Sequence, residues 1–250
     1  MKKIIIALLL MSGCVAMAQT NEELYAKAYK LKLEYKYKDA FPMFQALCKA
    51  DSNNVNYVQY ASYCYSKYGF YYAPEAEKMK YYKTAEYLAK KAIKLSETSA
   101  DAHYVYAMAL GRINENASSK QKIANAKIIR AQVDRAIALN PKLAGAYHIL
   151  GRWHRTIAGF NAIEKAMINS FFGGVPPGGS YDDAIKSFMT AISIEPKYMN
   201  HQYELAETYY EMGKEVEAKL WAQKALEITP TNDDDIKAKK DCEALIKKID

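Results

Sequence analysis

The chain has 250 residues, half of them apolar, so it is long enough to bury a sizeable core. Its 35 basic and 28 acidic residues give a formal net charge of +7, a mild excess that argues against nucleic-acid binding. Its four cysteines lack metal-like spacing, which argues against a zinc site and against a disulfide scaffold.

The first 18 residues differ in character from the rest. Lys2 and Lys3 precede an apolar run at residues 4–11, and an Ala-Met-Ala sequence at residues 16–18 precedes Gln19. This order is typical of a secretory signal peptide, so we expect residues 1–18 to be removed and residues 19–250 to be exported to the periplasm. The apolar run is too short to span a bilayer, and no later segment approaches the roughly 20 apolar residues that a span needs.

The same segment contains a second processing signal. Residues 11–14, Met-Ser-Gly-Cys, loosely resemble a lipoprotein cleavage site. Two alternatives stay open: a periplasmic protein cleaved after Ala18, or a membrane-anchored lipoprotein if Cys14 is lipidated. Three further cysteines, which we expect to be small buried apolar residues, are Cys48, Cys64 and Cys242.

Helical spacing of apolar and small residues then predicts five helix pairs in chain order. The pairs span residues 24–47, 57–92, 103–136, 147–191 and 205–225. The last three end in similar segments, AIALNP, AISIEP and ALEITP, and the final two prolines, Pro196 and Pro230, lie 34 residues apart. This period is that of the tetratricopeptide repeat.

Residues beyond Pro230 predict a terminal helix. Thr231 to Asp235 supply a capping side chain and three carboxylates that suit a helix N-terminus, and apolar residues such as Leu245 follow. No segment alternates with a period of two over a useful length, which argues against strands. We therefore expect an all-α, right-handed superhelix of about five tetratricopeptide-like pairs with insertions and a C-terminal capping helix, in one domain.

Extra residues interrupt the repeat pattern at three places: around Asn114 to Gln121, at residues 68–83, and at residues 161–180. The last segment has the apolar spacing of an amphipathic helix that ends in a Gly-Pro turn. We expect it to pack against the stack. The alternative is that Phe171 and Phe172 form a lid or a partner surface. The same two alternatives, packing against the stack or forming a functional surface, apply to residues 68–83.

The fourth repeat is more specific than a generic helix pair. GAYHILGRWHR at residues 145–155 is followed by FNAIEKAMINSFFGGVPPGG and DDAIKSFMTAISIEP. Over residues 99–232 the chain resembles the regulator of microtubule dynamics family, most specifically at Gly151-Arg152-Trp153 and at residues 171–176. The resemblance implies a tetratricopeptide-like domain and, for eukaryotic members, association with microtubules. It supplies no catalytic motif, and the export signal leads us to expect no microtubule partner here.

No motif for catalysis or for a bound cofactor stands out. The histidines show no HExxH spacing: His103, His148, His154 and His201. The glycines at residues 173–179 are not followed by Gly-Lys-Ser/Thr, which favours a structural turn over a phosphate loop. Neither a GxSxG elbow nor a cysteine with plausible partners is present. We expect no enzyme, metal or cofactor, and an envelope hydrolase is the least favoured hypothesis.

The helix positions that face the concave surface of such a stack predict an aromatic, locally basic groove. The first two repeats contribute Tyr25, Tyr29, Lys32 and Tyr65. The later repeats contribute Tyr104, Met108, Arg112, His148, Arg152, Arg155, Tyr203, Glu207 and Tyr210. The three arginines can bind a carboxylate or phosphate through paired hydrogen bonds. Alternatively, they pair with acidic neighbours such as Glu115, Glu164 or Glu207.

Two functional hypotheses follow from this groove. The leading one is a non-enzymatic periplasmic scaffold that binds a protein or peptide of acidic character. The alternative is a carrier of a small or lipidic anion, because an apolar insertion accompanies basic side chains. Neither hypothesis involves nucleic acid.

Overall fold

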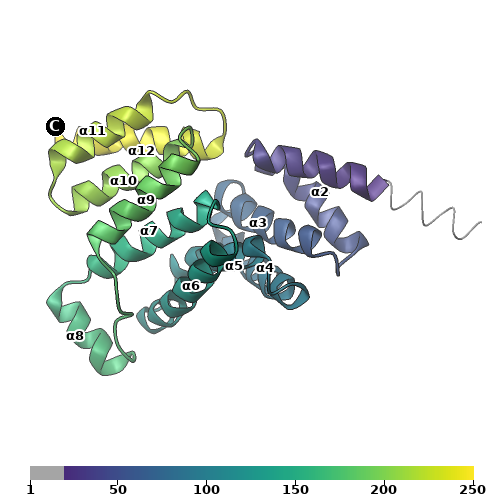
Figure 1. Ribbon diagram of the computed structural model, residues 1–250, viewed down its shortest axis with the longest axis horizontal. Coiled ribbons are helices and arrows are strands. Elements are labelled where there is room, and N and C mark those ends of the chain that lie inside the picture. The colour runs from purple at the N-terminus through teal and green to yellow at the C-terminus, as the bar shows by residue number, and fades with distance from the viewer. Residues whose placement is uncertain (1–19) are drawn as a thin grey trace, which may run out of the picture.

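The computed structural model describes residues 20–250, and every regular element in that range is an α-helix (Figure 1). The predicted signal peptide at residues 1–18 and the alternative lipidation site at Cys14 lie outside the described residues. From residue 20 onward, the chain contains no helix with the length and apolar character needed to cross a membrane. The all-α prediction is confirmed.

The described helices form five successive pairs followed by one single helix, and α8 is inserted between the two helices of the fourth pair. The first helix spans residues 20–33. The others are α2 (Tyr37–Ala50), α3 (Val55–Tyr71), α4 (Glu75–Leu95), α5 (Ala100–Asn114), α6 (Ser119–Leu139), α7 (Ala144–Ala158), α8 (Ala162–Phe171), α9 (Tyr181–Ile194), α10 (Met199–Glu211), α11 (Glu215–Leu226) and α12 (Asp233–Ile249). α3 packs on α4, α5 on α6, α7 on α9 and α10 on α11, as the repeat register predicts.

Local sequence explains where many helices begin and how the pairs fit together. Six helices start after a residue whose side chain accepts a hydrogen bond from a backbone N–H of the first turn: Asn54, Ser99, Ser118, Asn161, Ser180 and Asn232. Small residues allow close helix contact. A Cβ atom on Gly151 of α7 would lie only 2.7 Å from the Phe188 ring of α9, so this pair requires glycine there.

The three predicted insertions have different outcomes. Residues 68–83 form the end of α3 and the start of α4 around a short turn, and the extra residues after Asn114 lengthen α6 to 21 residues. Both insertions therefore extend helices of the repeats instead of forming separate loops. The third insertion contains α8, in which Ile168 alone is buried, so the expectation that this helix packs against the stack is wrong. The following loop does pack, because Val175 contacts the main core.

The two ends of the stack meet through a buried carboxylate. Asp234, in the first turn of α12, accepts hydrogen bonds from four side chains that are distant in sequence: Tyr37, Lys67, Tyr71 and Tyr198. The Lys67 ammonium lies 3.0 and 2.8 Å from the two carboxylate oxygens. We call these five residues the Asp234 cluster. It joins α2 and α3 to α12 and to the turn before α10.

A second contact closes the stack beside this cluster. Tyr35 adopts a positive φ of 57° in the turn before α2, an uncommon conformation for a residue other than glycine. Its ring stacks on that of Tyr198 with centroids 5.0 Å apart, and its hydroxyl donates to Glu195 at 3.4 Å. The repeat superhelix is thereby closed into a ring.

We expect Asp234→Asn to lower the free energy of unfolding by about 3–5 kcal/mol, because the substitution leaves the buried Lys67 ammonium without its counter-charge. Urea unfolding followed by circular dichroism measures the change. Asp241→Asn is the matched control, since Asp241 pairs with Lys237 on the surface of the same helix and should contribute less than about 1 kcal/mol. Equal, small losses in the two variants would show that the Asp234 cluster does not stabilise the closed ring.

Candidate ligand-binding pocket

A pocket of about 530 Å³ lies inside the ring. Its walls come from the end of the first helix and the turn after it, and from α3, α5, α6, α7 and the start of α10. Four of its lining residues also make the contacts that close the ring: Tyr35, Lys67, Glu195 and Tyr198. Its volume falls within the range of about 300–1,000 Å³ that is usual for small-molecule sites.

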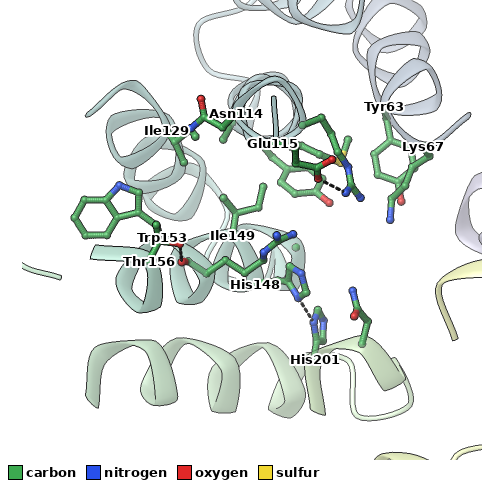
Figure 2. A pocket seen from close by; sticks show the side chains of 18 of the residues that line it. Tyr63, Lys67, Asn114, Glu115, Ile129, His148, Ile149, Trp153, Thr156 and His201 are labelled. Carbon is green, nitrogen blue, oxygen red and sulfur yellow. Dashed lines mark hydrogen bonds and ion pairs between the residues drawn. The ribbon is translucent and has the colours of Figure 1, made fainter. Parts of the chain in front are cut away.

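The two ends of the pocket differ in chemistry, as Figure 2 shows. Ile129 and Trp153 lie at one end, whereas Tyr63, Lys67 and His201 lie at the other. Ile157 and Phe160 also line the pocket and follow Trp153 along the chain, so they extend its apolar end. Asn114 and Thr156 also lie at the Trp153 end, so that end is rich in large apolar side chains without being wholly apolar, whereas the other end is polar with basic groups.

Five of the nine predicted residues from the later repeats line this pocket: Tyr104, Met108, Arg112, His148 and Arg152. Lys32, predicted from the first repeat, lines it too. The structure does not bring together the remaining predicted residues at this site: Tyr25, Tyr29, Tyr65, Arg155, Tyr203, Glu207 and Tyr210. Of the predicted lid residues, Phe171 is exposed and Phe172 is half-buried, and neither lines the pocket.

The residues outside the pocket have identifiable structural positions. Tyr25 and Tyr29 stack on each other in the N-terminal core, with ring centroids 5.8 Å apart. Tyr203 and Tyr210 belong to the C-terminal core, where α12 packs on α10 and occupies the surface predicted to line the groove. The capping helix therefore covers this part of α10, and only the start of α10 reaches the pocket.

Acidic neighbours hold the arginines in place. Arg112 pairs with Glu115 at 2.9 Å, as one of the sequence alternatives proposed, and its guanidinium lies 3.7 Å from the centre of the Phe70 ring. Arg155 pairs with Glu204 at 2.6 Å and Glu211 at 3.2 Å instead of with Glu164 or Glu207. Both cations are therefore largely neutralised by carboxylates.

Three pocket cations are free to meet a ligand: Arg152, Lys32 and Lys122, the last of which is exposed on α6 and forms no ion pair with another described residue. Arg152 lies 3.5 Å from Glu204, yet 47% of its side chain stays exposed. The Lys32 ammonium lies 5.1–5.5 Å from the centres of three tyrosine rings, Tyr29, Tyr60 and Tyr63, and forms no ion pair with any residue in the 20–250 range. Cation–π contacts leave most of the ammonium's hydrogen-bonding capacity available.

A buried histidine pair forms part of the same wall. The Nδ1 atoms of His148 and His201 lie 2.9 Å apart, and the Nε2 atom of His148 lies 3.9 Å from the Glu204 carboxylate. Burial lowers the pKa of His148 well below its ordinary value, so its ring is neutral at pH 7. Neither ring hydrogen-bonds a serine, threonine or cysteine in the described chain, so the pair lacks the geometry of a nucleophile and its base.

Sequence analysis missed several lining residues, chiefly Lys67, Trp153, Tyr198 and His201. Lys67 and Tyr198 reach the pocket only because the ring closes. Trp153 was recognised as a family mark, and its indole donates to the Ala126 carbonyl at 2.8 Å, which fixes its orientation at the apolar end. Of the three cysteines in the described residues, Cys64 and Cys242 are buried as expected, whereas Cys48 is half-buried.

We expect Glu204 to make stability depend on pH between about 4.5 and 2. Burial raises the pKa of this carboxyl, but the charges of Arg152 and Arg155 outweigh that effect and lower the pKa from 4.5 to about 2. Because the folded pKa is depressed, the stabilisation is complete above pH 4.5 and is lost as the pH falls towards 2; its size is about 3 kcal/mol.

Urea unfolding of the wild type and of Glu204→Gln at pH 6 and pH 3 measures this contribution. The variant should be less stable than the wild type at pH 6, and the difference should shrink at pH 3. A difference that stays constant over this range would contradict an ionised Glu204 in the folded state.

Comparison with known proteins agrees with the fold. A thermophilic tetratricopeptide repeat protein from Thermus thermophilus is 16% identical, with a TM-score of 0.64, and the alignment covers 90% of this chain and 98% of that one. At this identity the likeness supports the fold alone.

Sequence relatives identify the family. Regulator of microtubule dynamics protein 1 of Bos taurus is 33% identical over 162 residues, which make up 64% of this chain and 50% of the relative. The Pongo abelii protein of the same name is 30% identical over 210 residues, or 84% and 62%. The chain thus spans between half and two thirds of the length of these relatives. The family model described as regulator of microtubule dynamics protein 1-3 matches residues 22–250, so the chain belongs to the regulator of microtubule dynamics family.

Proposed function

We propose that this protein is a non-enzymatic carrier whose central pocket binds an amphipathic anion. The acidic group of this ligand would lie against the polar end of the pocket, near Lys32 and Arg152. The apolar part of the ligand would lie against Trp153 and the lining residues that follow it in the chain. The observation that carries this proposal is the contrast between the two ends of one pocket (Figure 2). The repeat fold and the family agree with a non-catalytic role.

The balance of charge at the polar end favours an anion. Lys67 and Arg112 are neutralised by Asp234 and Glu115, while Lys32 has no carboxylate partner in the described chain. Tyr104 keeps its hydroxyl proton, because burial raises the pKa of its phenol well above the usual range. It can therefore donate a hydrogen bond to an acidic ligand.

Closure of the ring favours a compact ligand over a long peptide. An extended peptide that follows a repeat groove contacts successive repeats, including the last. Here α12 covers the predicted groove residues of α10, namely Tyr203 and Tyr210, and the lining ends at the start of that helix. The enclosed space matches a ligand of small-molecule size.

A protein- or peptide-binding scaffold is the second candidate. It is favoured by the tetratricopeptide-like fold, which presents helix faces as a continuous binding surface. The peptide that fits the pocket chemistry is a short acidic segment with an apolar side chain. The location that we propose is the periplasm, on the basis of the N-terminal export signal, and for that reason we propose no microtubule partner.

We expect Gly111→Trp to abolish ligand binding and Gly111→Ala to preserve it. Gly111 lines the pocket from α5, and a Cβ atom at this position meets no atom within 4 Å, so a large side chain would fill the cavity. Both substitutions replace a helical glycine, and Ala should raise stability by about 0.5–1 kcal/mol. Titration with a fluorescent fatty acid and with a labelled peptide of alternating Leu and Glu measures binding.

The two ligands separate the candidates. Binding of the fatty acid alone, lost in Gly111→Trp, supports the carrier, whereas binding of the peptide alone supports the scaffold. Retention of both ligands by a folded Gly111→Trp variant would show that the pocket is not the binding site.

We expect Arg152→Gln to weaken binding of the pocket's anion about 10- to 100-fold, because a charge-assisted hydrogen bond contributes about 1.5–3 kcal/mol. Arg135→Gln is the control with the same change of charge, since Arg135 is exposed on α6 and does not line the pocket. The same titration measures both variants. Equal affinities would place the acidic group of the ligand elsewhere.

A further inference from the structure

An apolar stripe on α8 faces solvent. Ile163, Met167 and Phe171 are 74%, 52% and 73% exposed, and their spacing of four residues places them along one side of the helix. We call these three residues the α8 stripe. In Figure 1, α8 lies at the edge of the molecule, away from the helix pairs.

Local contacts hold the stripe in a fixed place. Asn161 and Glu164 form a capping box at the start of α8, with reciprocal hydrogen bonds of 2.9 and 2.8 Å. At the other end, the Asn169 amide oxygen accepts from the Val175 N–H at 3.0 Å. The exposure of the stripe is therefore a property of an ordered helix, and covering each large side chain would contribute about 1.5–3 kcal/mol.

Exposed lysines lie next to this stripe. Lys120 and Lys127 are exposed on one face of α6, two turns apart, and no acidic residue occurs between Glu115 and Asp134. Lys122 lies on the opposite face of α6, where it lines the pocket. The Lys127 ammonium donates to the Gly173 carbonyl at 2.8 Å, directly after α8, so α6 and the end of α8 are neighbours. We call Lys120 and Lys127 the α6 basic patch. An apolar stripe beside a group of cations is the pattern of a surface that binds anionic membranes.

We propose that the α8 stripe docks on an anionic lipid surface, with its side chains among the acyl chains and the α6 basic patch against the headgroups. A second copy of the chain fits less well, because two basic patches would repel each other across a symmetric contact. Three side chains also fall short of the roughly 800 Å² per partner that a stable protein interface buries. The proposal does not depend on which ligand the pocket binds.

Vesicle co-sedimentation tests this docking. We expect the protein to bind phosphatidylglycerol vesicles at least tenfold more tightly than phosphatidylcholine vesicles, and to lose that difference at high salt. Ile163→Ser/Met167→Ser/Phe171→Ser should weaken binding to phosphatidylglycerol at least tenfold. The matched control is Val216→Ser/Leu220→Ser, which removes two exposed apolar residues of α11 with the same spacing and should leave binding unchanged.

A second variant tests how much the lysine charges of the α6 basic patch contribute to vesicle binding. Lys120→Gln/Lys127→Gln should bring the two kinds of vesicle to similar affinities, and Lys122 stays unchanged because it lines the pocket. A further variant reports docking directly. In Met167→Trp, the fluorescence of the introduced tryptophan should shift to the blue when phosphatidylglycerol vesicles are added.

Three results would overturn the proposal. The first is that the wild type binds neither kind of vesicle, and the second is that the folded serine variant binds as well as the wild type. The third is that sedimentation velocity shows a dimer and that the serine variant is a monomer. The last result would identify a second copy as the occupant of the stripe. Pocket titrations with Gly111→Trp, which leaves α8 intact, keep a failure here separate from a failure of the carrier proposal.

Discussion

The buried carboxylate of Asp234 is the constraint on which the shape of the binding site depends. Burial by itself raises the pKa of a carboxyl, but the Lys67 ammonium and the hydroxyls of Tyr37 and Tyr71 outweigh it and hold the pKa of Asp234 well below its usual range. The charged form is thus the one that the closed ring stabilises. Because Lys67 and Tyr198 contact Asp234 and also line the pocket, an open ring would remove one wall and leave a groove.

Glu204 has the corresponding role between the fourth and fifth repeats, and it explains why two similar arginines differ. Arg155 makes the shorter ion pair with Glu204 at 2.6 Å, is only 12% exposed and also contacts Glu211, so its charge serves the packing of α7 on α10. Arg152 lies farther from the same carboxylate, at 3.5 Å, and half of it faces open space. One carboxylate therefore orients both guanidinium groups, and only one of them remains available to a ligand.

Much of the fold was predictable because the repeat signal reports contacts between neighbouring helices, as Gly151 against Phe188 illustrates. Ring closure was not predictable. Asp233 to Asp235 look like an ordinary helix start and do form one, while the partners of Asp234 on α2 and α3 lie 163–197 residues away. Their meeting depends on the curvature summed over every repeat, which no local pattern encodes. For the same reason, the predicted groove combined Tyr104 and Arg112 on α5, which line the pocket, with α10 residues that α12 covers.

The two proposed surfaces are joined by a short piece of chain. Thr156, Ile157 and Phe160 line the pocket, and Asn161 then caps α8. The order of residues predicted an amphipathic helix at this point, but amphipathicity alone does not say what covers the apolar side, and the structure shows that the stack does not. A lipid surface that covers the α8 stripe would lie close to the apolar end of the pocket. The apolar part of a ligand would then have a short path between the two environments, whereas its acidic group would stay near the cations of the far end.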